Sequence, residues 1–144
     1  ASHIVSSGKV YSVEIQKDFV DVIRDKIKAS GIKNVEVFWG DIEKIGGTKL
    51  ADHIADAVIL SNVLFQVEDK DKTIEEAKRV LKDGGQVLLI DWLDNSSLIN
   101  QKKINIIDKS KMREIFEKHS FVFVRDIDAG AHHYGMILKK NESR

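Results

Sequence analysis

The sequence contains no cysteine and no proline. Without cysteine the chain can form no disulfide, thiolate nucleophile or cysteine-based zinc site, which is typical of a cytosolic protein. Without proline, glycine and helix-capping acids must mark the ends of helices and strands. No apolar run approaches the roughly 18 residues that span a bilayer, and the first residues lack the layout of a signal peptide. We therefore expect a soluble, cytoplasmic protein without a membrane span.

An excess of either charge is also missing. Lys and Arg together number 23, as do Asp and Glu, so the formal net charge is zero. No overall positive field attracts nucleic acid or an anionic membrane, and we expect neither as a partner. A chain of 144 residues that is 42% hydrophobic fits one domain, 1–144, with a real core.

Three predicted strands each end in a polar or acidic residue. They cover residues 9–15, 34–41 and 55–62, and they end at Glu14, at Asp41 and at Ser61-Asn62. Parallel sheets bind ligands along the edge where the strands have their carboxyl ends. The polar ends therefore predict a nucleoside-type site at that edge.

Helices alternate with these strands. Apolar residues at helical spacing predict a helix that Gly31 ends, one that Asp69 caps and Gly84-Gly85 ends, and one that Asp108 caps. We expect the strand over residues 55–63 to be covered on both faces, and the charged helix face between Asp69 and Lys82 to be solvated. The segment 93–105 is a candidate lid. Two final strands, 121–128 and 132–140, predict an antiparallel hairpin, so the fold class is α/β with a mostly parallel, Rossmann-like sheet.

Four segments carry a resemblance to a known family. They read GKVYSVEI, NVEVFWGDIE, ADAVILSNVLFQVED and RVLKDGGQVLLIDW. Together they resemble the class I S-adenosylmethionine-dependent methyltransferases, especially the small-molecule branch of ubiquinone and menaquinone biosynthesis. The resemblance implies S-adenosylmethionine as cofactor and methyl transfer to a small-molecule acceptor.

The resemblance also implies which residues bind the cofactor. By motif position, Glu14 holds the ribose hydroxyls, Asp41 lies near the adenine amino group with Ile42 on the ring, and the strand end at 61–62 passes under the methionine portion. A carboxylate that accepts two hydroxyl donors is a sound physical reason for the first role. The cofactor-binding candidates are Glu14, Ile15, Asp41, Ile42, Ser61 and Asn62, and the substrate-pocket candidates are Phe65, Asp91, Trp92, His133 and Tyr134.

No catalytic residue is identified, although Asp91 is the best-placed acid. We predict no metal site, because the neighbouring His132 and His133 would point to opposite faces of a strand. Each cofactor candidate also has a plainer interpretation. Glu14 fits a solvated strand end, and Asp41 follows a glycine as in an ordinary turn.

The family's first strand and its glycine-rich loop have no counterpart in this sequence. None of the nine glycines has the required spacing. The missing strand would lie between the strands that end at Glu14 and Ser61, so two parallel edges should be left unpaired. We therefore expect a truncated methyltransferase fold with impaired cofactor binding, and a homo-oligomer is one way to cover the edges. The alternatives are an inactive remnant that serves as an oligomerisation or interaction module, and another Rossmann-like nucleotide-binding protein.

Overall fold

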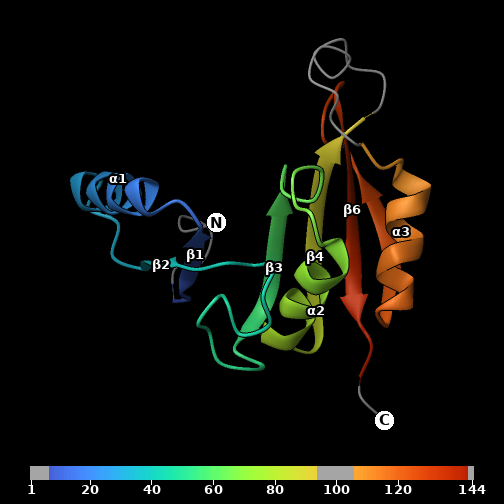
Figure 1. Cartoon of the computed structure of the whole chain (residues 1–144), viewed down its shortest axis with the longest axis horizontal. Coiled ribbons are helices and arrows are strands. Elements are labelled where there is room, and N and C mark those ends of the chain that lie inside the picture. Colours follow the sequence, from blue (N-terminus) through green and yellow to red (C-terminus); the bar gives the residue numbers. More distant parts are fainter. Residues whose placement is uncertain (1–6, 94–105, 143–144) are drawn as a thin grey trace.

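The computed structural model describes residues 7–93 and 106–142. Strands and helices alternate along most of this part of the chain (Figure 1), in agreement with the predicted α/β class. In chain order the elements are β1 (Val10–Glu14), α1 (Lys17–Ala29), β2 (Val35–Trp39), β3 (Ala55–Ser61), α2 (Lys70–Val80), β4 (Leu81–Trp92), α3 (Lys109–Lys118), β5 (Phe121–Ile127) and β6 (His133–Lys140).

The strands form two separate sheets. In the first, β1 and β2 are parallel, and in the second the order is β3-β4-β6-β5. The pair β3–β4 is parallel, whereas β6 runs antiparallel to both β4 and β5. The parallel strands and the antiparallel C-terminal hairpin were both predicted, and both are confirmed.

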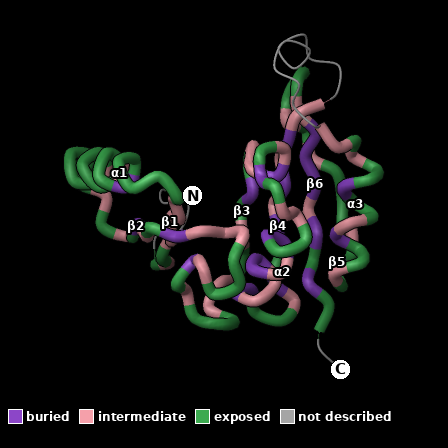
Figure 2. The backbone as a smooth tube through the Cα atoms, viewed as in Figure 1, coloured by how far each residue is buried: buried purple, intermediate pink, exposed green. Residues whose placement is uncertain are grey.

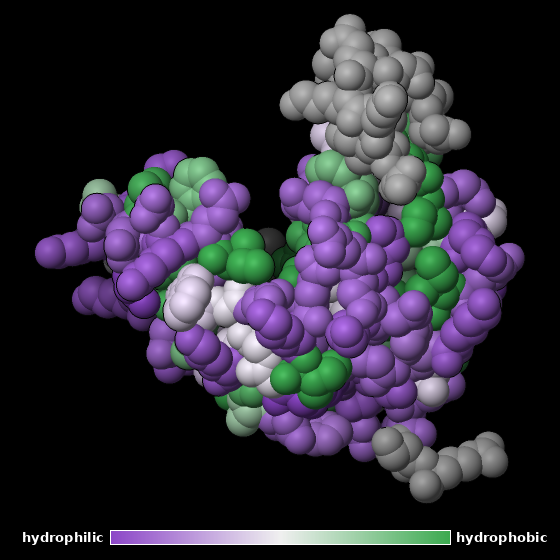
Figure 3. Space-filling model, viewed as in Figure 1, coloured by the Kyte–Doolittle hydropathy of each residue, from purple (hydrophilic) through white to green (hydrophobic). Residues whose placement is uncertain are grey.

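Among the described residues, no strand of the first sheet pairs with a strand of the second. Within the described ranges, β1 pairs only with β2, and the outer edge of β3 has no strand beside it. Figure 1 places α1, β1 and β2 to one side of β3, and Figure 3 shows a hollow there with hydrophobic residues on both sides. The expectation of two unpaired parallel edges is therefore confirmed for this part of the chain.

The main core lies between the second sheet and the helices α2 and α3. Ile74 of α2 and Phe116 of α3 are fully buried against Leu89 and Met136 from the centre of the sheet. Burying one such side chain stabilises the fold by about 1.5–3 kcal/mol. Figure 2 shows the buried segments concentrated along β4, β6 and the adjoining helices, whereas α1 is mostly exposed.

The sequence-based expectation that the strand over residues 55–63 is covered on both faces is wrong. Leu60 on β3 is buried, but its neighbour Ile59 is 54% exposed, and Ala57, on the same face as Ile59, is exposed as well. Successive residues of a strand point to opposite faces. Because α2 and α3 share the core face of this sheet, residues of β3 that point away from them meet no such cover.

The expected end of the second helix is also corrected. Helix α2 ends at Val80, and Leu81 already has extended backbone and is fully buried. Gly84, with φ of +73°, and Gly85 lie inside β4 instead, near the irregular start of its pairing with β3. Burial of Leu81 in the core therefore sets the boundary before the glycines are reached.

The predicted helix caps are confirmed. The Asp69 side chain accepts a hydrogen bond from the Lys72 amide, and the Asp108 side chain accepts from the amides of Ser110 and Lys111. Such caps satisfy amides that the first turn of a helix leaves free. No helix of the described ranges has the length and hydropathy to cross a membrane. Of the proposed lid, residues 94–105 lie outside the described part.

Candidate nucleoside-binding edge

The predicted site residues lie where strands of the two sheets end. In the second sheet β3 and β4 end at one edge, and β6, which runs the opposite way to β4, begins there (Figure 1). In the first sheet the parallel strands β1 and β2 end together. The loop after β2 reaches the segment after β3, because the Glu43 carboxylate accepts hydrogen bonds from the amides of Glu68 and Asp69.

Glu14 and Asp41 lie at neighbouring strand tips. Glu14 is the partner of Trp39 in the parallel register, and the Gly40 amide donates to the Glu14 carbonyl oxygen over 3.0 Å. Asp41 follows directly. The structure therefore brings the two acids to adjacent positions on one edge, as the strand pattern predicted.

The carboxylate of Asp41 is fixed by its own loop. Its Oδ1 accepts from the Glu43 amide over 3.0 Å, and its Oδ2 pairs with Lys44 Nζ at 2.8 Å. The hydrogen bond from Lys44, followed by that from the Glu43 amide, lowers the pKa of Asp41. Asp41 is therefore an ionised hydrogen-bond acceptor at neutral pH.

Ile42 packs against the main core, whereas Ile15 is 55% exposed. The Ile15 carbonyl oxygen accepts a hydrogen bond from Trp39 Nε1 over 2.8 Å. This bond ties the segment after β1 to the end of β2.

Asn62 at the end of β3 has the strongest signature of a ligand contact. Its φ is +55°, a left-handed conformation that is uncommon outside glycine, and its amide donates to the Ile90 carbonyl oxygen over 2.9 Å. Its side-chain Oδ1 is buried and has no hydrogen-bond partner in the described part of the chain. A buried acceptor without a partner is unfavourable unless a bound ligand or water supplies the donor. Ser61 beside it is exposed.

Asp91 joins the end of β4 to the segment after β3. It is 2% exposed, and its carboxylate accepts from the amides of Phe65 (3.1 Å) and Trp92 (2.8 Å). Burial raises the pKa of Asp91, and the two amides offset only part of that effect. The carboxyl group is therefore protonated more readily than an exposed aspartate.

Tyr134 of β6 faces Asp91 across the strand pair. The two are direct partners in the antiparallel register, and Tyr134 is 5% exposed. Its hydroxyl has no hydrogen-bond partner among residues 7–93 and 106–142. Burial raises the pKa of Tyr134, as do the nearby carboxyl groups of Asp91 and Asp108, so the phenol stays neutral.

Trp92 and His133 form a second cross-strand pair. Their ring centroids lie 4.1 Å apart, and the His133 Nε2 is buried without a partner in the described ranges. Because residues alternate along a strand, this pair lies on the opposite face of the sheet from Asp91 and Tyr134. The structure therefore divides four of the five pocket candidates between two faces of the sheet, and the fifth, Phe65, contacts Asp91 through its backbone amide.

The sequence patterns did not identify Glu76, which lies beside the loop that carries Asp41. Glu76 lies on the helix face that was expected to be solvated, yet it is 1% exposed. Its carboxylate holds the loop that follows Asp41. The available signal was its position between Thr73 and Val80 on the apolar stripe of α2, where an acid must have partners.

Known proteins resemble the chain throughout its length. A family model described as a methyltransferase domain matches residues 1–140. The chain is 31% identical over 109 residues to the ubiquinone/menaquinone biosynthesis C-methyltransferase of Haemophilus ducreyi. This match covers 72% of this chain and 41% of that protein. It is 25% identical over 118 residues to the demethylmenaquinone methyltransferase of Bacillus cytotoxicus, covering 82% and 48%. The chain thus spans less than half the length of these two curated relatives.

A solved structure gives the same picture. The crystal structure of a SAM-dependent methyltransferase from Aquifex aeolicus superposes with a TM-score of 0.82 at 25% identity, covering 96% of this chain and 72% of that one. The overall arrangement of the chain therefore matches that of a methyltransferase of known structure over nearly its whole length.

Proposed function

The chain belongs to the class I S-adenosylmethionine-dependent methyltransferases, and we propose that its nucleoside-binding edge holds S-adenosylmethionine for methyl transfer to a small-molecule acceptor. The observations that carry the proposal are the placement of Glu14 and Asp41 at adjacent strand tips and the buried oxygen of Asn62 at the end of β3, which has no hydrogen-bond partner in the described part of the chain.

The residues present fit this cofactor at three points. Glu14 offers a carboxylate to the two ribose hydroxyls, and Asp41 offers an ionised acceptor to the adenine amino group. The Asn62 oxygen offers a buried acceptor to the ammonium group of the methionine portion. When bound, the cofactor supplies a methyl group activated by a positively charged sulfur.

The chain's own contribution to the reaction is mainly proximity, orientation and exclusion of water. A general base is needed only where the acceptor atom must lose a proton. Asp91 is our candidate for that base, because it is buried at this edge and its pKa is raised. The hydroxyl of Tyr134 beside it is a candidate hydrogen-bond donor to the acceptor.

A second candidate function is an interaction module, favoured by the edges of β1 and β3 that no other strand of the described part covers. Unpaired strand edges are templates for pairing with another chain. This function predicts self-association or complex formation without cofactor binding, which size-exclusion chromatography with light scattering would detect.

Isothermal titration with S-adenosylhomocysteine separates the two functions. Cofactor use predicts saturable binding by the wild type and about a tenfold weaker affinity for Glu14→Gln, because the variant loses a hydrogen bond to a charged group. The matched control is Glu36→Gln on β2, whose exposed side chain pairs only with Lys9 in the described part. Absence of heat at millimolar ligand would overturn the proposal and favour the interaction module.

A further inference from the structure

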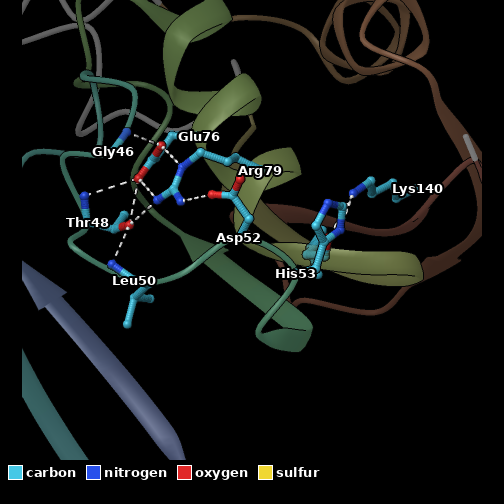
Figure 4. Close-up of polar contacts among 9 residues, drawn as sticks. Gly46, Thr48, Leu50, Asp52, His53, Glu76, Arg79 and Lys140 are labelled. Carbon is cyan, nitrogen blue, oxygen red and sulfur yellow. Dashed lines mark hydrogen bonds and ion pairs between the residues drawn. The ribbon is translucent and has the colours of Figure 1, made fainter.

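A single buried carboxylate fastens the loop that follows β2. Glu76 of α2 accepts hydrogen bonds from the Gly46 amide (2.7 Å), the Thr48 amide (3.1 Å) and the Thr48 hydroxyl (2.6 Å), as Figure 4 shows. The donors lie about 30 residues earlier in the sequence, and the Glu76 side chain is 1% exposed. An apolar residue at position 76 would leave the two amides without these partners.

Arg79 makes the burial of this charge tolerable. One turn further along α2, its Nε and Nη2 each donate to Glu76 over 2.8 Å, and Nη2 also reaches the Thr48 hydroxyl at 3.2 Å. Its remaining nitrogen pairs with Asp52. Buried charges are stable only when they are paired and hydrogen-bonded, and both conditions are met here.

The loop cannot hold its shape by local preference alone. Gly46, Lys49 and His53 all have positive φ, at +78°, +61° and +53°. Two of these residues carry side chains, which makes the left-handed conformation costly. Such a backbone persists when surrounding contacts determine it, and Glu76, together with the bond from the His53 amide to the Arg79 carbonyl oxygen, supplies them.

The fastened loop carries Asp41. The Asp41 amide donates to the Gly47 carbonyl oxygen over 3.0 Å, and the Gly47 amide donates to the Lys44 carbonyl oxygen over 2.8 Å. Gly47 lies so close to this turn that a Cβ there would collide with the Asp41 carbonyl oxygen. Movement of the segment 46–48 therefore displaces Asp41.

We propose that Glu76 is a positioning residue of the cofactor site, which acts through the loop 41–49 to hold Asp41 and Ile42 against the adenosine moiety. The inference rests on the proposed function. It predicts that loss of the Glu76 charge weakens recognition of the adenosine half of the ligand and does not change recognition of the methionine half.

The experiment compares Glu76→Gln with the matched control Glu114→Gln, an exposed acid on α3 that pairs with Lys111. Affinities are measured by isothermal titration, at a temperature where each variant is folded, for S-adenosylhomocysteine and for 5′-methylthioadenosine, which lacks the amino acid portion. We expect Glu76→Gln to lose at least about tenfold in affinity for both ligands, by the same factor, and Glu114→Gln to lose nothing. Asn62→Ala should weaken only S-adenosylhomocysteine.

Hydrogen exchange supplies a readout that does not depend on ligand. Glu76→Gln should speed the exchange of the Gly46 and Thr48 amides while those of β4 and β6 keep their wild-type rates. If Glu76→Gln does not fold, Thr48→Val, which removes one donor and keeps the carboxylate, replaces it with a smaller expected loss of affinity.

Two results would overturn the inference. A folded Glu76→Gln that binds both ligands as tightly as the wild type shows that Glu76 does not position the site. A folded Glu76→Gln that loses affinity for S-adenosylhomocysteine but not for 5′-methylthioadenosine shows that Glu76 acts on the methionine half of the ligand. If the wild type binds neither ligand, the proposed function itself fails, and the exchange rates alone then show whether Glu76 orders the loop.

Discussion

Asp91 of β4 and Tyr134 of β6 are direct cross-strand partners, and both side chains are buried. The Tyr134 hydroxyl, however, has no hydrogen-bond partner in the part of the chain that the structure describes. Burying a hydroxyl without a partner is unfavourable, so this group is held at a cost to stability. Such a cost is expected where a side chain serves a ligand rather than the fold.

Replacing this hydroxyl tests that interpretation. We expect Tyr134→Phe to leave the free energy of unfolding unchanged or to raise it by up to about 1 kcal/mol, because no hydrogen bond within the described residues is lost. Urea denaturation measures the change, with Tyr11→Phe on β1 as control. A loss of more than about 1.5 kcal/mol would show that the hydroxyl has a structural partner.

The acid stability of the protein should depend on Glu76. Burial of its carboxyl group would raise the pKa, but the hydrogen bonds from Arg79, Thr48 and Gly46 outweigh it and lower the pKa from 4.5 to about 2. Because the folded-state pKa is depressed, the stabilisation is complete above pH 4.5 and is lost as pH falls toward 2. The shift corresponds to about 3 kcal/mol. Chemical denaturation should show a wild-type advantage over Glu76→Gln that shrinks across this range, and a constant advantage would contradict it.

The contact between α3 and α2 should weaken at high pH. His119 Nδ1 lies 2.6 Å from Glu75 and its Nε2 lies 2.7 Å from Asp71. Burial would lower the pKa of His119, but the two carboxylates raise it above 6.5 on balance. This stabilisation is fully present below pH 6.5 and is lost as pH rises through the raised value. It should be less than about 1 kcal/mol, since Asp71 is exposed.

Thermal unfolding of His119→Gln at pH 6 and pH 9 measures this effect. The gap between wild type and variant should narrow at the higher pH, because the stabilisation by the charged imidazole is lost there. A gap that is independent of pH would mean that folding does not change the pKa of His119, which would contradict its pairing with the two carboxylates.

Gly47 should tolerate substitution less than Gly31. A Cβ on Gly47 would collide with the Asp41 carbonyl oxygen, whereas one on Gly31 would meet nothing within 4 Å. Gly31→Ala should destabilise the fold by about 1 kcal/mol, because the backbone there has a left-handed φ of +65°. We expect Gly47→Ala to cost at least about 2 kcal/mol in urea denaturation and to weaken binding of S-adenosylhomocysteine. Equal costs at the two positions would contradict the close packing of the loop on Asp41.

Local patterns predicted most of the elements. Apolar periodicity located the strands and helices, and the side chains of Asp69 and Asp108 marked two helix starts as expected. These features depend on residues close together in the sequence. The end of α2 was predicted wrongly, because the helix already ends where Leu81 enters the core, before Gly84 and Gly85 are reached.

The candidate site was only partly predictable. The strand ends placed Glu14 and Asp41 on one edge, since that follows from the parallel arrangement of β1 and β2. The division of Trp92 and Asp91 between two faces also follows from alternation along a strand. The role of Glu76 could not be predicted in this way, because its partners Gly46 and Thr48 belong to a loop whose shape depends on the packed structure.

The most direct test of this account is a titration of the isotope-labelled protein with S-adenosylhomocysteine, followed by the chemical shifts of its backbone amides. We predict that the largest changes fall on residues 14–16, 41–43 and 61–63, with little change at Gly84 and Gly85 away from that edge. Changes centred on those glycines, or no change at saturating ligand, would contradict a cofactor site at the carboxyl ends of the strands.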